Sequence, residues 1–255
     1  MKGPTLLDLR CRDHAAADSG RACDRCTVRS KAICADLSAD EITGLNQIAR
    51  SRRLRAGQQI NSSQEHAEYF AIVVSGSVKL TKVLPDGRQQ IVGLLFPSDF
   101  LGWPFETRAT SHAEAATDVQ LCSFPSAAFE RLITQYPNVQ NRLFRYAFSQ
   151  LDAAQDWMLL LGRKTAREKV ASLFVLVAKR SRGLESCGFD GAGRERFELP
   201  LSRSDIADYL GLTLETVSRQ LRVLKSDGII RFDGTRNVTI LDPARLSEAA
   251  TTPFI

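Results

Sequence analysis

The feature that most constrains the fold of this chain is a tight turn between two predicted helices near Gly211. Residues 202–210 carry a helical pattern whose start can be capped by Ser202 or Ser204. The inner face of this first helix is predicted to carry Ile206, Ala207 and Leu210. Gly211 follows Ala207 by four residues. The small Ala lets a second helix approach, and Gly accepts a left-handed backbone cheaply, so the pattern predicts a helix-turn-helix.

The second helix is predicted to begin after Thr213, its cap, and to end near Gly228. Its inward positions are Val217, Leu221 and Leu224, which leaves Glu215, Ser218, Arg219 and Arg222 on the exposed side. Two β runs, 229–232 and 237–241, follow it and are joined by Asp233-Gly234, a strong hairpin signal. A hairpin in this place is a wing. The order predicts a winged helix-turn-helix that binds DNA, against the alternative of an ordinary α+β subdomain with a charged surface.

The charge distribution agrees with a polyanionic partner. The chain has a formal net charge of +5, and residues 163–255 hold 16 basic and 12 acidic side chains, so most of the excess lies around the predicted DNA-binding unit. No apolar run approaches the roughly 20 residues needed to cross a bilayer. The N-terminus lacks a secretory pattern, because Leu9 is followed at once by charged residues. We therefore expect a cytoplasmic protein without a membrane partner, whose six cysteines serve as metal ligands, redox groups or buried hydrophobes.

The rest of the chain predicts an α+β protein with a β sensor domain ahead of a long helix. Residues 1 to about 36 are polar and irregular. Between about 50 and 125, four short β-rich runs separated by turn signals predict an antiparallel barrel or jelly roll; these are 69–74, 78–83, 91–96 and 119–124. A Gly-rich connector is expected at 182–195, after a helix at 164–180.

The long helix is predicted from near Pro137 to Gly162 and carries an apolar seam. Steps of three and four residues link Phe144, Ala147, Leu151, Ala154, Met158 and Leu161. A seam of this length favours pairing with the same helix of a second chain. The alternative is that the helix packs only on its own barrel.

Four cysteines are candidates for a metal centre. Cys23, Cys26 and Cys34 lie within a dozen residues of the irregular segment, where thiolates can fold around a soft metal. A complete site needs a fourth ligand, and Cys122, in the last barrel strand, is the candidate. By itself Cys122 would be read as a buried apolar cysteine, and a structural zinc on all four is the main competing site. Cys11 and Cys187 have no evident partners.

The segment Leu212-Thr213-Leu214-Glu215-Thr216-Val217-Ser218-Arg219 resembles the recognition helix of the CRP/FNR superfamily, in its E-x-x-S-R form. The order of barrel, long helix and winged domain is also that of the superfamily. The cysteine pattern is similar to the FNR branch, and its spacing to FnrL-type anaerobic regulators. The resemblance implies domains at 1–20 (tail), 21–137 (iron-sulfur loop and sensor barrel), 138–162 (dimerisation helix) and 163–255 (DNA-binding domain).

The same resemblance implies an oxygen-responsive activator of anaerobic genes. Cys23, Cys26, Cys34 and Cys122 would bind a 4Fe-4S cluster that oxygen converts to 2Fe-2S or removes. A homodimer would bind a palindrome related to TTGAT-N4-ATCAA through Glu215, Thr216, Ser218, Arg219 and Arg222, since Arg can grip guanine and Glu can accept from cytosine. The loop at 82–88 corresponds to a surface that contacts RNA polymerase in relatives, although a plain solvated hairpin is an equal alternative.

The sequence also bears on other signals and functions. Trp103 follows Gly102 where a cyclic nucleotide-binding barrel would have Glu, and Ser111-His112-Ala113 lacks the phosphate-binding Arg, so no cyclic nucleotide is expected. The same fold could respond instead to haem, nitric oxide or zinc. A metal-binding enzyme with an accessory winged domain is the alternative from another class. The sequence shows no catalytic grouping, so we expect no enzyme activity.

Overall fold

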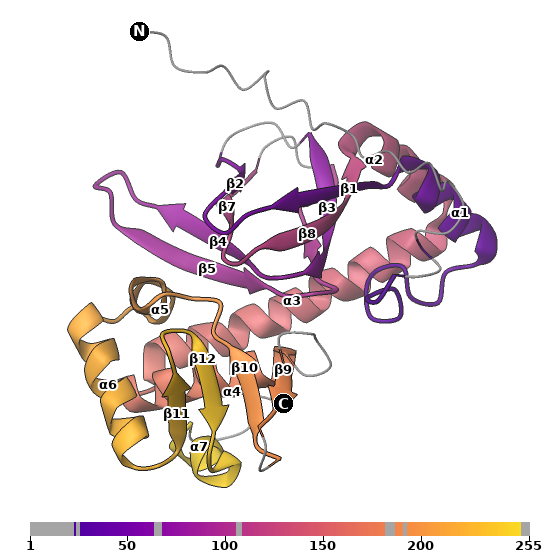
Figure 1. Cartoon of the computed structure of the whole chain (residues 1–255). Coiled ribbons are helices and arrows are strands. Elements are labelled where there is room, and N and C mark those ends of the chain that lie inside the picture. Colours follow the sequence, from indigo (N-terminus) through magenta and orange to yellow (C-terminus); the bar gives the residue numbers. More distant parts are fainter. Residues whose placement is uncertain are drawn as a thin grey trace, which may run out of the picture.

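The computed structural model describes Cys23 and residues 26–63, 68–105, 109–181, 187–190 and 193–250. A β sandwich, a long helix and a C-terminal winged helix-turn-helix follow one another along the chain (Figure 1). This order confirms the predicted fold class. The predicted tail, residues 1–20, lies outside the described residues, as does Cys11.

Two four-stranded antiparallel sheets form the sandwich, with strand orders β1-β8-β3-β6 and β2-β7-β4-β5. The strands are β1 (Arg50–Leu54), β2 (Gln59–Asn61), β3 (Tyr69–Ser75), β4 (Val78–Val83), β5 (Gln89–Leu95), β6 (Phe100–Leu101), β7 (His112–Ala115) and β8 (Val119–Pro125). The four predicted runs correspond to β3, β4, β5 and β8. The other four strands were missed because they are short or, like the arginine-rich β1, polar.

Two apolar cores lie on either side of the sheet that contains β3 and β8. The inner core fills the sandwich with small and branched side chains such as Ala71, Val73 and Leu121. The outer core joins Phe70, Phe100, Phe124 and Phe129 to apolar side chains of the N-terminal segment. Because successive strand residues point to opposite faces, adjacent residues of β3 and β8 serve different cores.

Two helices that the sequence analysis missed flank the outer core. The first, α1 (Ala39–Ile48), begins at a capping box in which Ser38 and Glu41 each accept the other's backbone N–H. The second, α2 (Ser126–Gln135), follows β8 directly and buries Phe129, Leu132 and Ile133. Together they close the end of the sandwich on which the N-terminal segment lies (Figure 1).

The long helix α3 (Pro137–Arg163) runs beneath the sandwich to the winged domain (Figure 1). Pro137 occupies its first turn, where a missing N–H costs nothing. Only Val139 near its start and Leu160 near its end are buried. Most of the helix between them is exposed in the single chain. None of the described helices is both long and apolar enough to cross a membrane.

The winged domain contains α4 (Ala166–Ser181), β9 (Cys187–Phe189), β10 (Glu195–Glu198), α5 (Arg203–Leu210), α6 (Leu214–Ser226), β11 (Ile230–Asp233), β12 (Asn237–Ile240) and α7 (Pro243–Ala249). Its sheet has the order β11-β12-β10-β9. The predicted connector at 182–195 was therefore wrong in part. A strand pair, β9 and β10, extends the wing sheet there, and β10 carries the fully buried Phe197 just beyond the predicted connector.

The winged domain packs on the sandwich and on α3. The ammonium group of Lys79 on β4 lies 2.8 Å from the Asp205 carboxylate on α5, and the Gln90 amide of β5 donates to the Tyr209 carbonyl at 3.0 Å. The ring of Trp157 on α3 stacks on Tyr209 with centroids 4.0 Å apart. Arg180 on α4 forms an ion pair with the buried Asp99 of the sandwich. The sandwich, the long helix and the winged domain therefore meet at one junction.

Candidate metal centre and nucleic-acid interface

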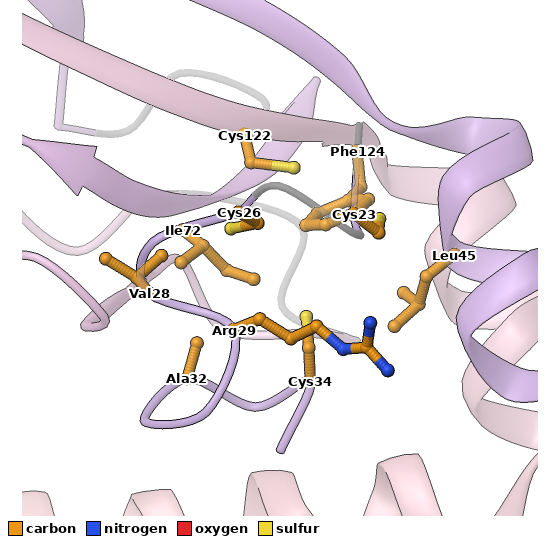
Figure 2. Close-up of a pocket in the computed structure, with 10 residues that line it drawn as sticks. All are labelled: Cys23, Cys26, Val28, Arg29, Ala32, Cys34, Leu45, Ile72, Cys122 and Phe124. Carbon is orange, nitrogen blue, oxygen red and sulfur yellow. The ribbon is translucent and has the colours of Figure 1, made fainter. Parts of the chain in front are cut away.

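The four predicted cysteine ligands line a single cavity at the outer face of the sandwich (Figure 2). Cys23, Cys26 and Cys34 come from the N-terminal segment, and Cys122 comes from β8. All four are thiols rather than disulfides. The fold thus brings together residues that are up to 99 positions apart in the chain.

The loop from Cys26 to Cys34 is held in place by its apolar side chains. Val28, Ala32 and Ile33 are buried in the outer core, beside the phenylalanines of β3 and β8. Turn hydrogen bonds shape the backbone, with the N–H groups of Lys31 and Ala32 both donating to the Val28 carbonyl at 3.0 Å. The segment that the sequence suggested to be polar and irregular is therefore anchored by three buried apolar side chains.

Cys122 is fixed by the sheet itself. β8 lies between β1 and β3, where Cys122 stands opposite Ser51 and Ile72. Strand alternation turns its side chain to the outer face, whereas its neighbour Leu121 is buried in the inner core. The Cys23 thiol donates to the Asn46 amide oxygen at 3.4 Å.

Burial strongly affects the acidity of two of these thiols. It is the main cause that raises the pKa of Cys34 to about 12, repulsion from the other three cysteines adds to it, and Arg29 lowers it. Burial likewise raises the pKa of Cys122 to about 12, followed by repulsion from Cys23 and Cys26. Both thiols are protonated at neutral pH. Four thiolates cannot form in this cavity without a positive centre to compensate them.

The cysteine cavity is small, and its thiols stand apart in this structure. Among the described residues, no three Cys, His, Asp or Glu side chains converge closely enough to hold a single metal ion. The thiols instead surround a cavity of about 30 Å³ whose other walls are mainly Val28, Ala32, Leu45, Ile72 and Phe124. That volume holds a water molecule or two, so the loop must move outward to admit a larger group.

The helix-turn-helix has the predicted geometry. Ser202, rather than Ser204, caps α5, and Gly211 adopts the left-handed conformation with φ of 60°. Thr213 caps α6, accepting the Thr216 N–H at 3.2 Å. The predicted inward residues of both helices are buried, namely Ile206, Ala207, Leu210, Val217, Leu221 and Leu224.

The predicted DNA-binding residues belong to α6, which lies at the outer edge of the winged domain (Figure 1). Glu215, Arg219 and Arg222 are exposed, and Thr216 and Ser218 are half-buried. A hydrogen bond from its own backbone N–H, and a second with Thr213, lower the pKa of the Glu215 carboxyl. Its carboxylate is therefore an acceptor only, as pairing with a cytosine amino group requires.

The long helix exposes a continuous apolar face in the single chain. Its large exposed side chains are Phe144, Phe148, Leu151, Met158 and Leu159. Of the other residues in the predicted seam, Ala154 is exposed, Ala147 is half-buried, and Leu161 packs partly on the winged domain's own core. The exposed apolar face therefore includes Phe148 and Leu159, which the predicted seam, with its steps of three and four residues, did not contain.

Two family models match the chain, a Crp-like helix-turn-helix domain over residues 168–249 and a cyclic nucleotide-binding domain over residues 51–136. The transcriptional activator protein FnrL of Cereibacter sphaeroides is 45% identical over 228 residues, which are 89% of this chain and 91% of that protein. The chain belongs to the CRP/FNR family of transcription regulators. The resemblance inferred from the recognition helix and the cysteines is confirmed.

Other relatives of this CRP/FNR regulator agree. The nitrogen fixation regulation protein FixK of Bradyrhizobium diazoefficiens is 37% identical over 232 residues, 91% of this chain and 95% of that protein. The structure of FixK2 from Bradyrhizobium japonicum matches with a TM-score of 0.71 and 35% identity, covering 81% of this chain and 99% of that one. This CRP/FNR protein is thus a DNA-binding transcriptional activator of the FNR, FixK and Anr type that acts as a dimer, and not an enzyme.

Sequence reasoning missed some residues of both sites. It did not include Arg29, which lines the cysteine cavity, or Phe148 and Leu159 on the apolar face of α3. Arg29 lies between Cys26 and Cys34 in the sequence, and that position between two predicted ligands could have identified it.

Proposed function

We propose that this regulator is an oxygen-responsive activator of anaerobic genes whose Cys23, Cys26, Cys34 and Cys122 bind a 4Fe-4S cluster. The observation that carries the proposal is that a loop and a distant sheet strand place all four thiols around one cavity. When bound, the cluster supplies oxygen sensitivity, because oxygen converts it to 2Fe-2S or removes it. The predicted domains at 21–137, 138–162 and 163–255 are retained as part of this proposal.

The cavity residues respond to the bound group in two ways. The thiols must release their protons when they ligate, since a metal binds the thiolate. The loop must also shift outward, because the cavity has room for little more than water. Val28, Ala32 and Ile33 would carry that shift into the outer core, because they pack there beside Phe100 and Phe129.

A chain of contacts leads from the outer core to the winged domain. The Tyr146 hydroxyl on α3 donates to the Phe100 carbonyl and accepts the Phe100 N–H, each at 3.1 Å. The neighbouring residue, Asp99, accepts the Phe96 N–H at 2.8 Å and pairs with Arg180 of α4. A displacement at the cysteine cavity can therefore reach both the dimer helix and the DNA-binding domain.

The output is binding of a palindromic operator related to TTGAT-N4-ATCAA by two recognition helices. Arg219 would donate to a guanine, Glu215 would accept from a cytosine amino group, and Ser218 would contact a neighbouring base. Each good contact would be worth about 1–3 kcal/mol of discrimination between bases. Thr216 and Arg222 would contact the same site. The apolar face of α3, including Phe144, Ala147, Leu151, Ala154, Met158 and Leu161, would pair the two chains so that the helices sit about 34 Å apart.

Two further parts of the proposal concern partners. The hairpin at 82–88 would contact RNA polymerase, which is supported by the exposed apolar side chains of Val83 and Leu84. No cyclic nucleotide would bind, because Trp103 stands where the family's Glu is expected and apolar side chains pack the sandwich interior. The regulator would work in the cytoplasm, where a bacterial operator lies.

Anaerobic purification tests the proposal. We expect a brown protein with iron and sulfide near four per chain, bleached by air with loss of operator binding. Replacing Cys23, Cys26, Cys34 or Cys122 with Ser should abolish the colour and the response, whereas Cys187→Ser, on β9 of the winged domain, is the matched control and should leave both unchanged. A colourless zinc protein, a haem spectrum, or a response to nitric oxide but not to oxygen would contradict it.

A further inference from the structure

The cysteine cavity contains one charged side chain. Of the ten residues that line it, four are the cysteines, five are apolar, and the remaining one is Arg29 (Figure 2). A guanidinium group is permanently charged and costs free energy to bring beside apolar walls. Arg29 therefore brings the one permanent charge among the residues that line the cavity.

The loop fixes Arg29 in this position. Its backbone N–H donates to the Cys26 carbonyl at 3.3 Å, so the turn that begins at one ligand directs the Arg29 side chain. Its neighbour in the chain, Val28, is buried in the outer core. Arg29 itself is half-buried, and its side chain extends across the cavity with the guanidinium group toward Leu45 (Figure 2).

The charge that enters the cavity on loading is negative. Four thiolates carry more negative charge than the core of a 4Fe-4S cluster carries positive charge, so the loaded centre is an anion among apolar walls. A nearby fixed cation stabilises such an anion far more than it would in water. Lys31, two residues away in the same loop, is exposed and is not among the lining residues.

We propose that Arg29 is a positioning residue that retains the anionic metal–thiolate centre in the cavity through its fixed positive charge. The inference rests on the proposed function, since it concerns the same site. It adds that the strength with which the four cysteines hold iron depends on a side chain that ligates nothing. Arg29 would thus set how readily the regulator loses its signal.

The test is the rate of iron release to EDTA without oxygen, followed by the loss of the visible absorbance. Full-length wild type, Arg29→Gln, Arg29→Lys and Lys31→Gln are reconstituted anaerobically, and their iron and sulfide contents are measured first. We expect Arg29→Gln to release iron roughly tenfold faster, the scale of one unit charge about 10 Å away at an effective dielectric constant near 20. Arg29→Lys should restore most of the retention, because it keeps the charge.

The controls separate the possible failures. Lys31→Gln removes the same charge from the same loop outside the cavity, and a rate equal to that of Arg29→Gln would overturn the inference. So would equal rates for Arg29→Gln and wild type, or no recovery in Arg29→Lys. If Arg29→Gln does not load at all, loading of Arg29→Lys supports the inference and its absence overturns it. A wild type without iron would instead overturn the proposed function.

Discussion

The ion pair between Asp99 and Arg180 allows a quantitative prediction about how the sandwich holds the winged domain. Asp99 is only 5% exposed and also accepts the Phe96 N–H at 2.8 Å, whereas the Arg180 side chain is 38% exposed. Asn keeps the shape of Asp and can still accept from Phe96, so Asp99→Asn removes chiefly the charge. A hydrogen bond to a charged group is worth about 1.5–3 kcal/mol when buried, and exposed pairs about 0.2–1 kcal/mol. The 38% exposure of Arg180 places the expected coupling at about 1.5 kcal/mol, the lower end of the range for buried pairs.

A double-mutant cycle of Asp99→Asn with Arg180→Gln measures this coupling by urea unfolding. Arg180 also lies over the Phe96 ring, 5.4 Å from its centroid, and the cycle subtracts that contact. The fluorescence of Trp157 reports on the same junction through its stack on Tyr209. We expect Asp99→Asn also to bring the operator affinities of cluster-loaded and apo protein closer together. If the effects of the two single variants on the free energy of unfolding add to within about 0.3 kcal/mol, the reasoning is refuted.

Three further predictions concern DNA, dimer and thiols. Arg219→Ala should weaken operator binding by about 1–3 kcal/mol and relax the preference at one base pair. Arg222→Ala should weaken binding to all DNA sequences alike and lower the slope of log affinity against log salt by about 1. Identical selectivity profiles of the two variants in binding assays would contradict this. Phe148→Asp, on a side chain that is 66% exposed, should raise the dimer dissociation constant more than tenfold in sedimentation experiments. Ser149→Asp, at an exposed polar position outside the apolar face, should not. Burial raises the pKa of Cys34 and Cys122 to about 12 in the folded apo protein, whereas thiols in the unfolded chain have pKa values near 9.0. The unfolded chain therefore releases these protons at lower pH, and the free energy of unfolding should fall as the pH rises from 9 toward 12. Cys122→Ala should flatten that fall in urea unfolding at several pH values, and an unchanged slope would contradict the assignment.

The winged domain could be predicted closely because its signals are local. Gly211, Thr213 and the Asp233-Gly234 turn each determine backbone geometry within a few residues, and the structure places all of them as expected. The β9–β10 pair could not be predicted in this way. Its stability comes from Phe197 packing against Phe174 of α4, a contact between residues distant in the chain.

The cysteine site was predictable in its members and not in its surroundings. The spacing of Cys23, Cys26 and Cys34 identified three candidates, and the resemblance to the FNR branch added Cys122. That a half-buried Arg29 shares their cavity depends on how the loop turns after Cys26, which no periodicity encodes. The same holds for α3, where packing of Leu161 on the winged domain turns the exposed face toward Phe148.

The separation of the four cavity cysteines along the chain sets the order in which they become available during synthesis. Cys34 is made 88 residues before Cys122, and Cys122 is held in place only between β1 and β3 of a folded sheet. Synthesis proceeds at about 5–20 residues per second, so Cys122 is added roughly 4–18 s after Cys34. During that interval the growing chain contains the three loop cysteines without Cys122, so the site is incomplete. If the four cysteines bind the proposed cluster, iron and sulfide would be needed only after the sandwich closes, so the site would be complete later than the domain that surrounds it.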